Sequence, residues 1–320
     1  MHWMRSWKLR PPGTGDGAGS APGPKSGNQI VNGPLRSLLF CPGDNIRRMH
    51  KALAAGADAA ILDLEDSVHP GAKDAARAMV ASFLAGERDV PVAVRVNADD
   101  TPWHLADLAA VLPGRPDAVM LPKCDSPATL RRLSDRLDAL EAAFSLPPGS
   151  VAILPLVTES AGALVDMAYR DVTPRLAALC FGAEDLASEI GIEARDGAGM
   201  NPLLLHVRHR VAIAAAAAGV MAIDTPFPDP ARPAGLAAEA AGAAAAGYAG
   251  KLCIHPGQIA VVHQAFRPDP DRIAWARATV AALGVSSTGV AVVGGRMVDR
   301  AHLKLAKRYL GTAQAEAETE

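Results

Sequence analysis

From Arg36 onward the chain repeats one pattern: a short apolar run rich in Val, Ile and Leu, a polar turn, and a segment with apolar residues at helical spacing. We expect the apolar runs to be strands, at Ser37–Cys41, Ala59–Leu64, Val92–Val96, Ala118–Leu121, Val151–Val157, Ala177–Phe181, Val220–Ile223 and Gly250–Ile254. We expect helices between or after them, near residues 45–55, 72–85, 103–111, 127–143, 160–168, 201–218, 231–246 and 256–265. Continuous apolar strands that alternate with helices are typical of a parallel sheet buried on both faces. The pattern therefore predicts an α/β fold, and its eight repeats predict a (β/α)8 TIM barrel. An open, doubly wound sheet is the alternative, and the missing G-x-G-x-x-G turn after the first strand argues against it.

The same pattern divides the chain into three parts. Residues 1–34 are rich in Gly, Pro and Ser and have no periodicity, so we expect a disordered leader. Residues 35–265 hold the eight repeats and form the predicted barrel, the catalytic domain. Residues 266–320 continue past the last repeat, with expected helices at Asp271–Leu283 and near Arg300–Leu310 and a turn-rich stretch between them. A C-terminal extension of this kind has to cover its own barrel mouth or that of a neighbour.

Composition excludes several classes of protein. The 320 residues carry 32 basic and 34 acidic side chains, a formal net charge of −2, whereas a nucleic-acid-binding domain is usually strongly basic. No apolar run approaches the length of about 18 residues that a membrane span needs. The four cysteines are far apart and lie in apolar runs, so we expect buried free thiols and a cytoplasmic location.

Polar groups follow nearly every expected strand. The runs after the strands contain, in order, Asp44, Glu65, Asn97, Lys123, Glu159, Asp185, Asp224 and His255. In a parallel barrel the carboxyl ends of all strands meet at one mouth, where the chemistry of this fold takes place. Charges of both signs in this series therefore indicate an active site.

Glu159 and Asp185 follow adjacent strands, the fifth and the sixth. Two carboxylates in one mouth repel each other unless a proton or a cation lies between them. Hard oxygen ligands without a nearby Cys or His favour Mg²⁺. The alternative is that each carboxylate caps the helix that follows it, and the two roles are compatible.

Three further side chains have both a functional and a structural interpretation. Arg95 lies at the wall of the mouth, where it either pairs with Glu65 or holds a carboxylate or developing enolate with its planar fork. Lys123 is a candidate Schiff-base lysine, although nothing in its surroundings suggests a desolvating cage. His255 is a candidate general base, but the sequence HPGQ reads equally well as the first turn of a helix.

Taken together, the motifs resemble the citrate lyase β-subunit-like enzymes of the HpcH/HpaI aldolase and citrate lyase superfamily. The motifs are RSLLFCPGDN (36–45), ILDLEDSV (61–68), VRVN (94–97), MLPK (120–123), LVTES (156–160), FGAEDL (181–186) and GKLCIHPGQI (250–259). The resemblance covers about residues 35–310. It implies a TIM barrel that assembles as homotrimers or hexamers, and it implies a CoA-thioester lyase.

Site roles follow from this resemblance position by position. Glu159 and Asp185 match the family's Mg²⁺ ligands, Arg95 matches the arginine that contacts the 2-oxo acid, and Glu65 matches a carboxylate that orders the mouth. The segment GGRMVDRAH (294–302) resembles the family's C-terminal lid, in which Asp299 would be the acid/base that reaches a neighbouring subunit. Two departures bear on the substrate: the fifth strand reads TES where ETA is usual, and Ala301 stands where proline is common.

The reaction implied is a reversible Claisen-type cleavage of a 2-hydroxyacyl-type CoA ester, such as malyl-CoA or citramalyl-CoA, into an acyl-CoA and a 2-oxo acid. Arg47, Arg48 and Lys51, on the first helix, are candidates to hold the CoA phosphates, although a solvated helix face would look the same.

Three alternatives remain. The first, a metal-dependent aldolase acting on free acids, needs neither a lid aspartate nor a basic first helix. The second is a lyase subunit acting on an acyl-carrier-protein thioester, which the C-terminal extension argues against. The third is a non-catalytic barrel that binds an anionic metabolite, which the intact site residues disfavour.

Overall fold

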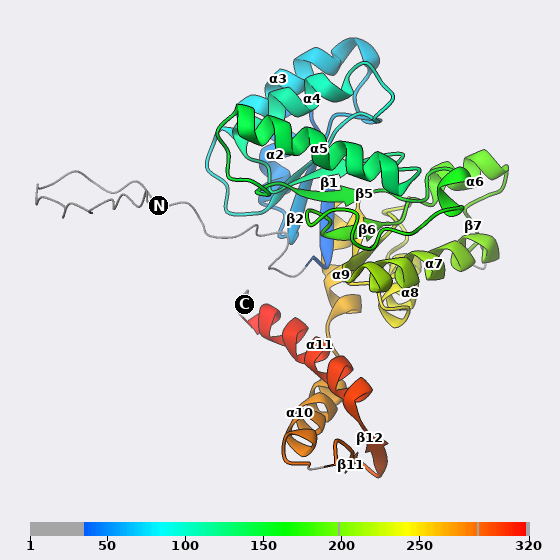
Figure 1. Cartoon of the computed structure of the whole chain (residues 1–320). Coiled ribbons are helices and arrows are strands. Elements are labelled where there is room, and N and C mark those ends of the chain that lie inside the picture. The colour runs from blue at the N-terminus through cyan, green and yellow to red at the C-terminus, as the bar shows by residue number, and fades with distance from the viewer. Residues whose placement is uncertain (1–34, 198, 287, 318–320) are drawn as a thin grey trace, which may run out of the picture.

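The computed structural model describes residues 35–197, 199–286 and 288–317, so the leader expected at residues 1–34 lies outside the described residues. Eight parallel strands form the centre of the molecule, in the spatial order β5-β4-β3-β2-β1-β10-β9-β6 (Figure 1). These strands are β1 (Ser37–Pro42), β2 (Ala59–Asp63), β3 (Val92–Arg95), β4 (Ala118–Leu121), β5 (Ala152–Pro155), β6 (Ala178–Cys180), β9 (Met221–Asp224) and β10 (Gly250–Cys253). Each lies within an expected run or differs from it by one residue.

The sheet closes on itself between β5 and β6. The Ile153 N–H donates to the Arg175 carbonyl at 2.8 Å, and the Val157 N–H donates to the Cys180 carbonyl at 3.1 Å. These bonds belong to parallel bridges that join the two ends of the eight-stranded sheet. The closed parallel sheet confirms the prediction of a TIM barrel.

Helices surround the barrel and connect successive strands (Figure 1). They are α2 (Ile46–Leu53), α3 (Lys73–Leu84), α4 (His104–Val111), α5 (Pro127–Ala143), α6 (Glu184–Ile190), α7 (Pro202–Ala218), α8 (Pro233–Ala245) and α9 (Ile259–Phe266). Short 3-10 turns lie at η1 (Pro70–Ala72), η2 (Leu112–Gly114), η3 (Gly162–Leu164) and η4 (Pro256–Gln258). A two-stranded hairpin of β7 (Arg195–Asp196) and β8 (Gly199–Met200) follows α6.

The helix expected at residues 160–168 is wrong. The structure has only the 3-10 turn η3 there, and an irregular segment leads to β6. Gly162 lies in the first turn of the expected helix, where glycine costs about 1 kcal/mol relative to alanine. The strand β6 is followed by the seven-residue helix α6, which the hydrophobic pattern did not predict.

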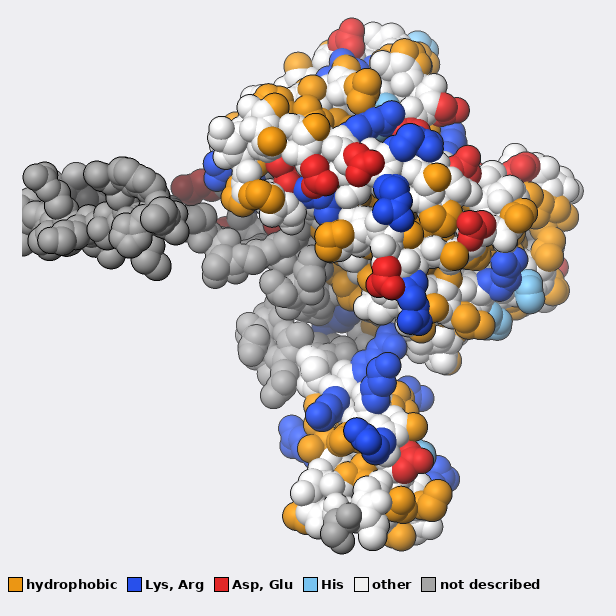
Figure 2. Space-filling view, in the orientation of Figure 1, with side chains coloured by type: hydrophobic (Ala, Val, Ile, Leu, Met, Phe, Trp, Pro, Cys, Tyr) orange, Lys and Arg blue, Asp and Glu red, His pale blue; other side chains and the backbone are white. Residues whose placement is uncertain are grey.

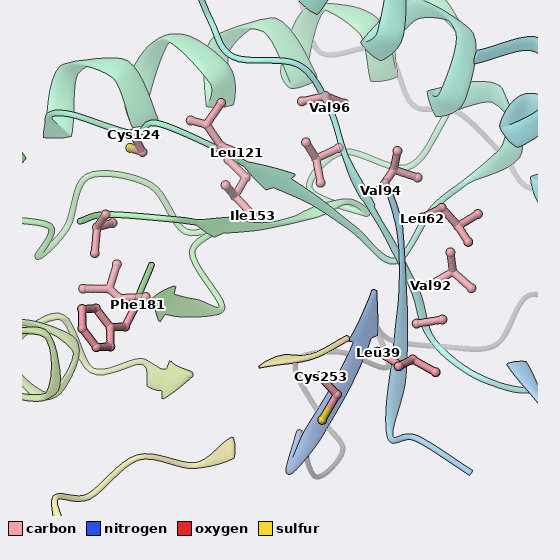
Figure 3. Close-up of a cluster of buried hydrophobic side chains, with 14 of the residues drawn as sticks. Leu39, Leu62, Val92, Val94, Val96, Leu121, Cys124, Ile153, Phe181 and Cys253 are labelled. Carbon is pink, nitrogen blue, oxygen red and sulfur yellow. The ribbon is translucent and has the colours of Figure 1, made fainter. Parts of the chain in front are cut away.

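Alternate residues of each strand face two different cores. Leu38, Ile61 and Leu154 fill the barrel interior, in one cluster of buried side chains. Leu39, Leu62 and other strand residues face outward and pack under the helices in a larger cluster, part of which Figure 3 shows. Burial on both faces explains why the strands read as continuous apolar runs rather than alternating ones. Among the described residues, no helix is both long and apolar enough to cross a membrane.

An appendage follows the barrel and projects away from it (Figure 1). It consists of α10 (Pro270–Gly284), a hairpin of β11 (Ala291–Val293) and β12 (Arg296–Val298), and α11 (Arg300–Ala317). Trp275 of α10 packs edge-on against His302 and Tyr309 of α11, with ring centroids 6.4 and 6.3 Å apart. The hairpin lies at the end distant from the barrel, and Figure 2 shows several Lys and Arg side chains on the appendage surface.

Candidate active site

Arg95 is held at the mouth by a two-point ion pair with Asp63. Register pairs Arg95, the last residue of β3, directly with Asp63, the last residue of β2. Arg95 Nε and Nη2 donate to the two Asp63 carboxylate oxygens at 2.7 and 2.8 Å. Burial would raise the pKa of Asp63, but the hydrogen bonds from Arg95 hold it below its usual value. Asp63 is therefore an ionised anchor for the guanidinium, a partner that the sequence interpretation missed.

Glu65 is the second partner of Arg95, a pairing that was one of the two alternatives expected from the sequence. Its Oε2 lies 2.9 Å from Arg95 Nη1, and its Oε1 lies 3.4 Å from Lys123 Nζ. The exposed carboxylate of Asp66 lies 3.5 Å from Arg95 Nη1. Burial, followed by the opposing attraction of Arg95 and the repulsion of Asp66, leaves the pKa of Glu65 raised to about 7. Glu65 thus lies between two cations and is close to its titration point at neutral pH.

Two donors fix the backbone that carries Glu65. Lys73 Nζ, buried at the start of α3 beneath the Trp103 ring, donates to the carbonyls of Leu64 and Glu65 at 2.8 and 2.7 Å. The side-chain amide of Asn97 donates to the same Leu64 carbonyl at 3.0 Å. Asn97, one of the polar groups that follow the strands, therefore holds a loop and does not point at a substrate.

Glu159 is buried after β5, in a space that Gly182 leaves open. A Cβ at Gly182 would lie 2.9 Å from Glu159 Cγ. The Thr158 hydroxyl and the Gly182 backbone exchange two hydrogen bonds of 2.9 Å, which tie together the loops after β5 and β6. Glu159 Oε2 accepts a short hydrogen bond from the Lys123 backbone N–H.

Asp185 lies in the exposed first turn of α6, directly after the Gly182 loop. Burial raises the pKa of Glu159 to about 8, and repulsion from Glu65 and Asp185 adds to the shift. A buried carboxylate whose ionised form is disfavoured by two neighbouring carboxylates fits a site for a divalent cation, which would relieve the repulsion. Among the described residues, no three or more His, Cys, Asp and Glu side chains are grouped so that they could hold a metal ion by themselves.

The structure gives the other candidate groups structural roles. Asp224, at the end of β9, is buried and bonded to Arg208 at 2.9 Å and to Lys251 Nζ at 2.6 Å. His255 Nδ1 accepts from the Gly257 N–H at 3.1 Å and caps η4, which matches the helix-start interpretation. Against the effect of burial, Glu65 and Asp66 raise the pKa of Lys123, which favours its ammonium form and disfavours the Schiff-base role.

Arg47, Arg48 and Lys51 are exposed on α2, which begins three residues after β1. The Asn45 side chain caps this helix by accepting from the Arg48 N–H at 3.0 Å. The first turn of α2 therefore lies at the carboxyl end of β1, at the rim of the mouth.

Asp299 is not part of the mouth within this chain. It follows β12 directly and caps α11 by accepting from the Ala301 N–H at 2.9 Å, and His302 Nδ1 lies 2.7 Å from its Oδ1. The contact with His302 holds the pKa of Asp299 below its usual value. The hairpin places Asp299 at the end of the appendage distant from the barrel (Figure 1).

A pocket of about 360 Å³ lies next to α6. Glu184 and Ile192 line it together with Arg195 and Pro228. Arg195 Nε pairs with Glu239 at 2.7 Å, and Arg195 Nη2 donates to the Pro226 carbonyl, beyond the end of β9. The pocket lies between the Glu184 side of α6 and the segment that carries Arg195.

A closed barrel with an anchored arginine and several carboxylates at its mouth defines an α/β-barrel enzyme with an acidic active site. A family model described as HpcH/HpaI aldolase/citrate lyase matches residues 36–256, and the chain belongs to this family. Family membership confirms both the resemblance found in the sequence and the prediction of a lyase.

Individual relatives cover nearly the whole chain. Citrate lyase subunit beta of Escherichia coli is 35% identical over 291 residues, 88% of this chain and 95% of that protein. (3S)-malyl-CoA thioesterase of Cereibacter sphaeroides is 34% identical over 296 residues, 88% of this chain and 95% of that protein. The structure of CitE from Mycobacterium tuberculosis in complex with magnesium, acetoacetate and coenzyme A is 34% identical, with a TM-score of 0.71, and the match covers 89% of this chain and 99% of that one.

Proposed function

We propose that the protein is a Mg²⁺-dependent lyase that reversibly cleaves a carbon–carbon bond of a 2-hydroxyacyl-type CoA ester, malyl-CoA or citramalyl-CoA or a close analogue, into an acyl-CoA and a 2-oxo acid. The observation that carries the proposal is the anchored fork of Arg95 beside the buried Glu159 and the exposed Asp185. The magnesium and coenzyme A in the M. tuberculosis relative, and the malyl-CoA thioester in the name of the C. sphaeroides relative, support it.

Glu159 and Asp185 would hold the Mg²⁺. The Lys123 N–H bonds to Oε2 of Glu159, which leaves Oε1 for a cation. When bound there, Mg²⁺ acts as a Lewis acid and template for the carboxylate and carbonyl oxygens of a 2-oxo acid.

Arg95 would stabilise the charge that develops on the substrate oxygen as the carbon–carbon bond breaks. A guanidinium has five N–H groups, and Asp63 accepts from two of those on Arg95, one on Nε and one on Nη2, while Glu65 faces Nη1 as an ion pair. The second N–H of Nη2 and an N–H of Nη1 form a donor pair for substrate oxygens. The anchoring by Asp63 means that this donor pair is oriented before the substrate arrives, so little free energy is lost in ordering it.

Asp299 would protonate the thioester enolate that leaves in cleavage and would remove the proton in condensation. Its place at the far end of the appendage supports action on a neighbouring chain, in a homotrimer or hexamer that exchanges the appendages as lids. The contact with His302 favours the ionised carboxylate in the undocked lid, and this is the form that acts as a base.

Arg47, Arg48 and Lys51 would bind the CoA phosphates, since they are exposed cations at the rim of the mouth. The pocket beside α6 offers space for the chain of the thioester. A cytoplasmic location belongs to the same proposal, and the four free, buried cysteines support it.

The alternatives are a free-acid aldolase, a subunit acting on an acyl-carrier-protein thioester, and a non-catalytic binder. The C-terminal extension does not exclude the second, because the match to E. coli citrate lyase subunit beta covers 88% of this chain and so extends beyond the barrel. The anchored Arg95 fork presents donors in a fixed orientation, which favours an enzyme over a non-catalytic binding protein.

The decisive experiment incubates the purified protein with Mg²⁺ and malyl-, citramalyl-, β-methylmalyl- or citryl-CoA, with matching acyl-carrier-protein thioesters and with the free acids. Release of an acyl-CoA together with a 2-oxo acid supports the proposal. Free CoA without an oxo acid indicates thioester hydrolysis. Cleavage of only the carrier-protein thioesters or only the free acids supports the corresponding alternative.

A further inference from the structure

Lys123 has a backbone conformation that its residue type disfavours. Among the described residues, four that are not glycine have a positive φ: Arg115, Lys123, Ser145 and Asp171. Arg115 ends η2, Ser145 follows α5 and Asp171 lies in the loop before β6. Lys123, with φ of 51°, is the one of these four that follows a barrel strand at the mouth. A left-handed lysine at such a place is a strained feature that functional sites often contain.

The left-handed backbone lets this one residue contact two carboxylates from different parts of the barrel. Its N–H donates to Glu159 Oε2, beyond β5. Its Nζ lies 3.4 Å from Glu65 Oε1, beyond β2, and the other oxygen of Glu65 faces Arg95. The side chain of Lys123 is still 52% exposed, so the ammonium is reached from solvent while Glu65 is buried.

We propose that Lys123 is a positioning residue with two separate roles: its backbone N–H fixes Glu159, and its ammonium fixes Glu65 and, through Glu65, the Nη1 group of Arg95, which Asp63 does not hold. The inference deepens the proposed function, on which it rests for the roles of Glu159 as a cation ligand and Arg95 as the oxo-acid binder. Glycine at this position would keep the N–H and would remove the strain of the positive φ. The presence of lysine therefore indicates a role for its side chain.

The proposal predicts a split between two affinities. Removing the ammonium by Lys123→Gln or Lys123→Gly leaves the N–H on Glu159, so the affinity for Mg²⁺ stays within about threefold of the parent or becomes tighter. Glu65 loses one of its two cations and no longer holds Nη1 of Arg95 in place, so the Mg²⁺-dependent affinity for pyruvate or oxaloacetate falls by about tenfold or more. Lys123→Arg restores most of that affinity, because it returns a cation to Glu65.

Calorimetric titration with Mg²⁺ alone, and then with pyruvate or oxaloacetate in saturating Mg²⁺, measures both affinities without turnover. Arg115→Gly is the matched control: it removes a cation from a residue with the same φ of 51°, far from the mouth, and should change neither affinity. Lys123→Gly relieves the left-handed backbone, so its melting temperature should stay within about 2 °C of the parent or rise.

Retention of oxo-acid affinity within threefold in both Lys123→Gln and Lys123→Gly overturns the inference, and so does a parallel loss of Mg²⁺ and oxo-acid affinity. The proposed function fails separately, if the parent binds Mg²⁺ and an oxo acid but cleaves no thioester; the affinity split still decides the role of Lys123. A parent that binds neither ligand overturns both.

Discussion

At the scale of single residues, the mouth is organised around one guanidinium shared among three carboxylates. Asp63 and Glu65 are two residues apart on the chain, and both face Arg95. The pairing with Asp63 is direct and buried, and truncating one partner of a buried ion pair is costly because the other remains charged. If Arg95 has the proposed functional role as well as this structural one, a useful variant must retain the charge.

We expect Arg95→Lys to lower kcat/KM by about 10²–10³-fold, while the barrel remains folded. Lysine keeps a positive charge beside Asp63, but a single ammonium cannot hold both Asp63 oxygens and still present two N–H groups to a substrate. Steady-state kinetics with the CoA ester identified by the substrate screen measures the effect, and circular dichroism checks the fold. A variant with near-parental kcat/KM would show that Arg95 only closes the barrel wall.

Glu159→Gln or Asp185→Asn should abolish Mg²⁺-dependent cleavage, and an excess of chelator should abolish it in the parent. A neutral amide is a much poorer ligand for a hard cation than a carboxylate. Glu189→Gln is the matched control, since it removes a carboxylate from the same helix α6 at its opposite end. Full activity in chelator would contradict the metal site.

The sequence predicted which residues gather at the mouth but not how they pair. An ion pair between Arg95 and Glu65 was one of the expected alternatives. The structure contains it, because the two residues lie at the ends of adjacent strands. The stronger partner, Asp63, is the last residue of β2, and only the strand register shows that it lies directly opposite Arg95. The left-handed backbone of Lys123 leaves no signal in residue type, so its contact with Glu159 could not be predicted.

At the scale of elements, the strands were predictable and the short segments were not. Burial on both faces gives every strand a continuous apolar run, a signal that needs no tertiary information. The helix α6 has only seven residues, the hairpin β7–β8 has two residues a strand, and the hairpin β11–β12 exposes Val292 and Met297. Such elements depend on local hydrogen bonds more than on burial, so hydrophobic patterning does not reveal them.

Lys73 bonds helix α3 to the loop after β2, so replacing it should lower the stability of the fold. Lys73→Met keeps the length of the side chain but removes one donor from each carbonyl, so that Glu65 retains only the Val68 N–H and Leu64 retains only Asn97. We expect the free energy of unfolding to fall by about 1–3 kcal/mol. Urea denaturation followed by circular dichroism measures this, and unchanged stability would indicate that the ammonium is not needed to hold the loop.

His104, the first residue of α4, should make the barrel sensitive to mild acid. Its Nδ1 lies 2.7 Å from the Asn97 carbonyl, its Nε2 is buried without a hydrogen-bond partner among the described residues, and burial lowers its pKa. In the unfolded chain this histidine takes up a proton near pH 6.5, before it does so in the fold. The stabilisation from the depressed pKa is therefore complete above about pH 6.5 and is lost as the pH falls toward the folded-state value. Melting temperatures between pH 7.5 and 5 should fall more steeply in the parent than in His104→Gln, and equal slopes would contradict this.

At the scale of the whole molecule, the proposed site combines the barrel of one chain with the appendage of a neighbouring chain. Such a site forms only if chains associate. The mouth supplies Arg95, Glu159 and Asp185, whereas Asp299 lies at the far end of a projecting arm (Figure 1). Val292 and Met297 of the arm's hairpin are 71% and 64% exposed, which is unfavourable for an isolated chain and suits a surface that docks. Gly294 and Gly295, both with positive φ, form the tight turn of the hairpin.

Asp299→Ala and Glu159→Gln should each be inactive alone and partly active together. If each mouth receives its lid from a neighbour, a ring that mixes the two variants contains interfaces where an intact Glu159 meets an intact Asp299. In a trimer with random exchange, a substantial minority of interfaces pairs two intact partners, so activity should return to a measurable fraction of the parent. The variants are mixed under conditions that allow subunit exchange, mixing is verified by mass spectrometry of differently tagged chains, and acyl-CoA release is followed with time. Each variant exchanged with itself is the control. Verified mixed rings that stay inactive would show that the lid closes on its own chain, because in that arrangement no mouth ever combines the two intact residues.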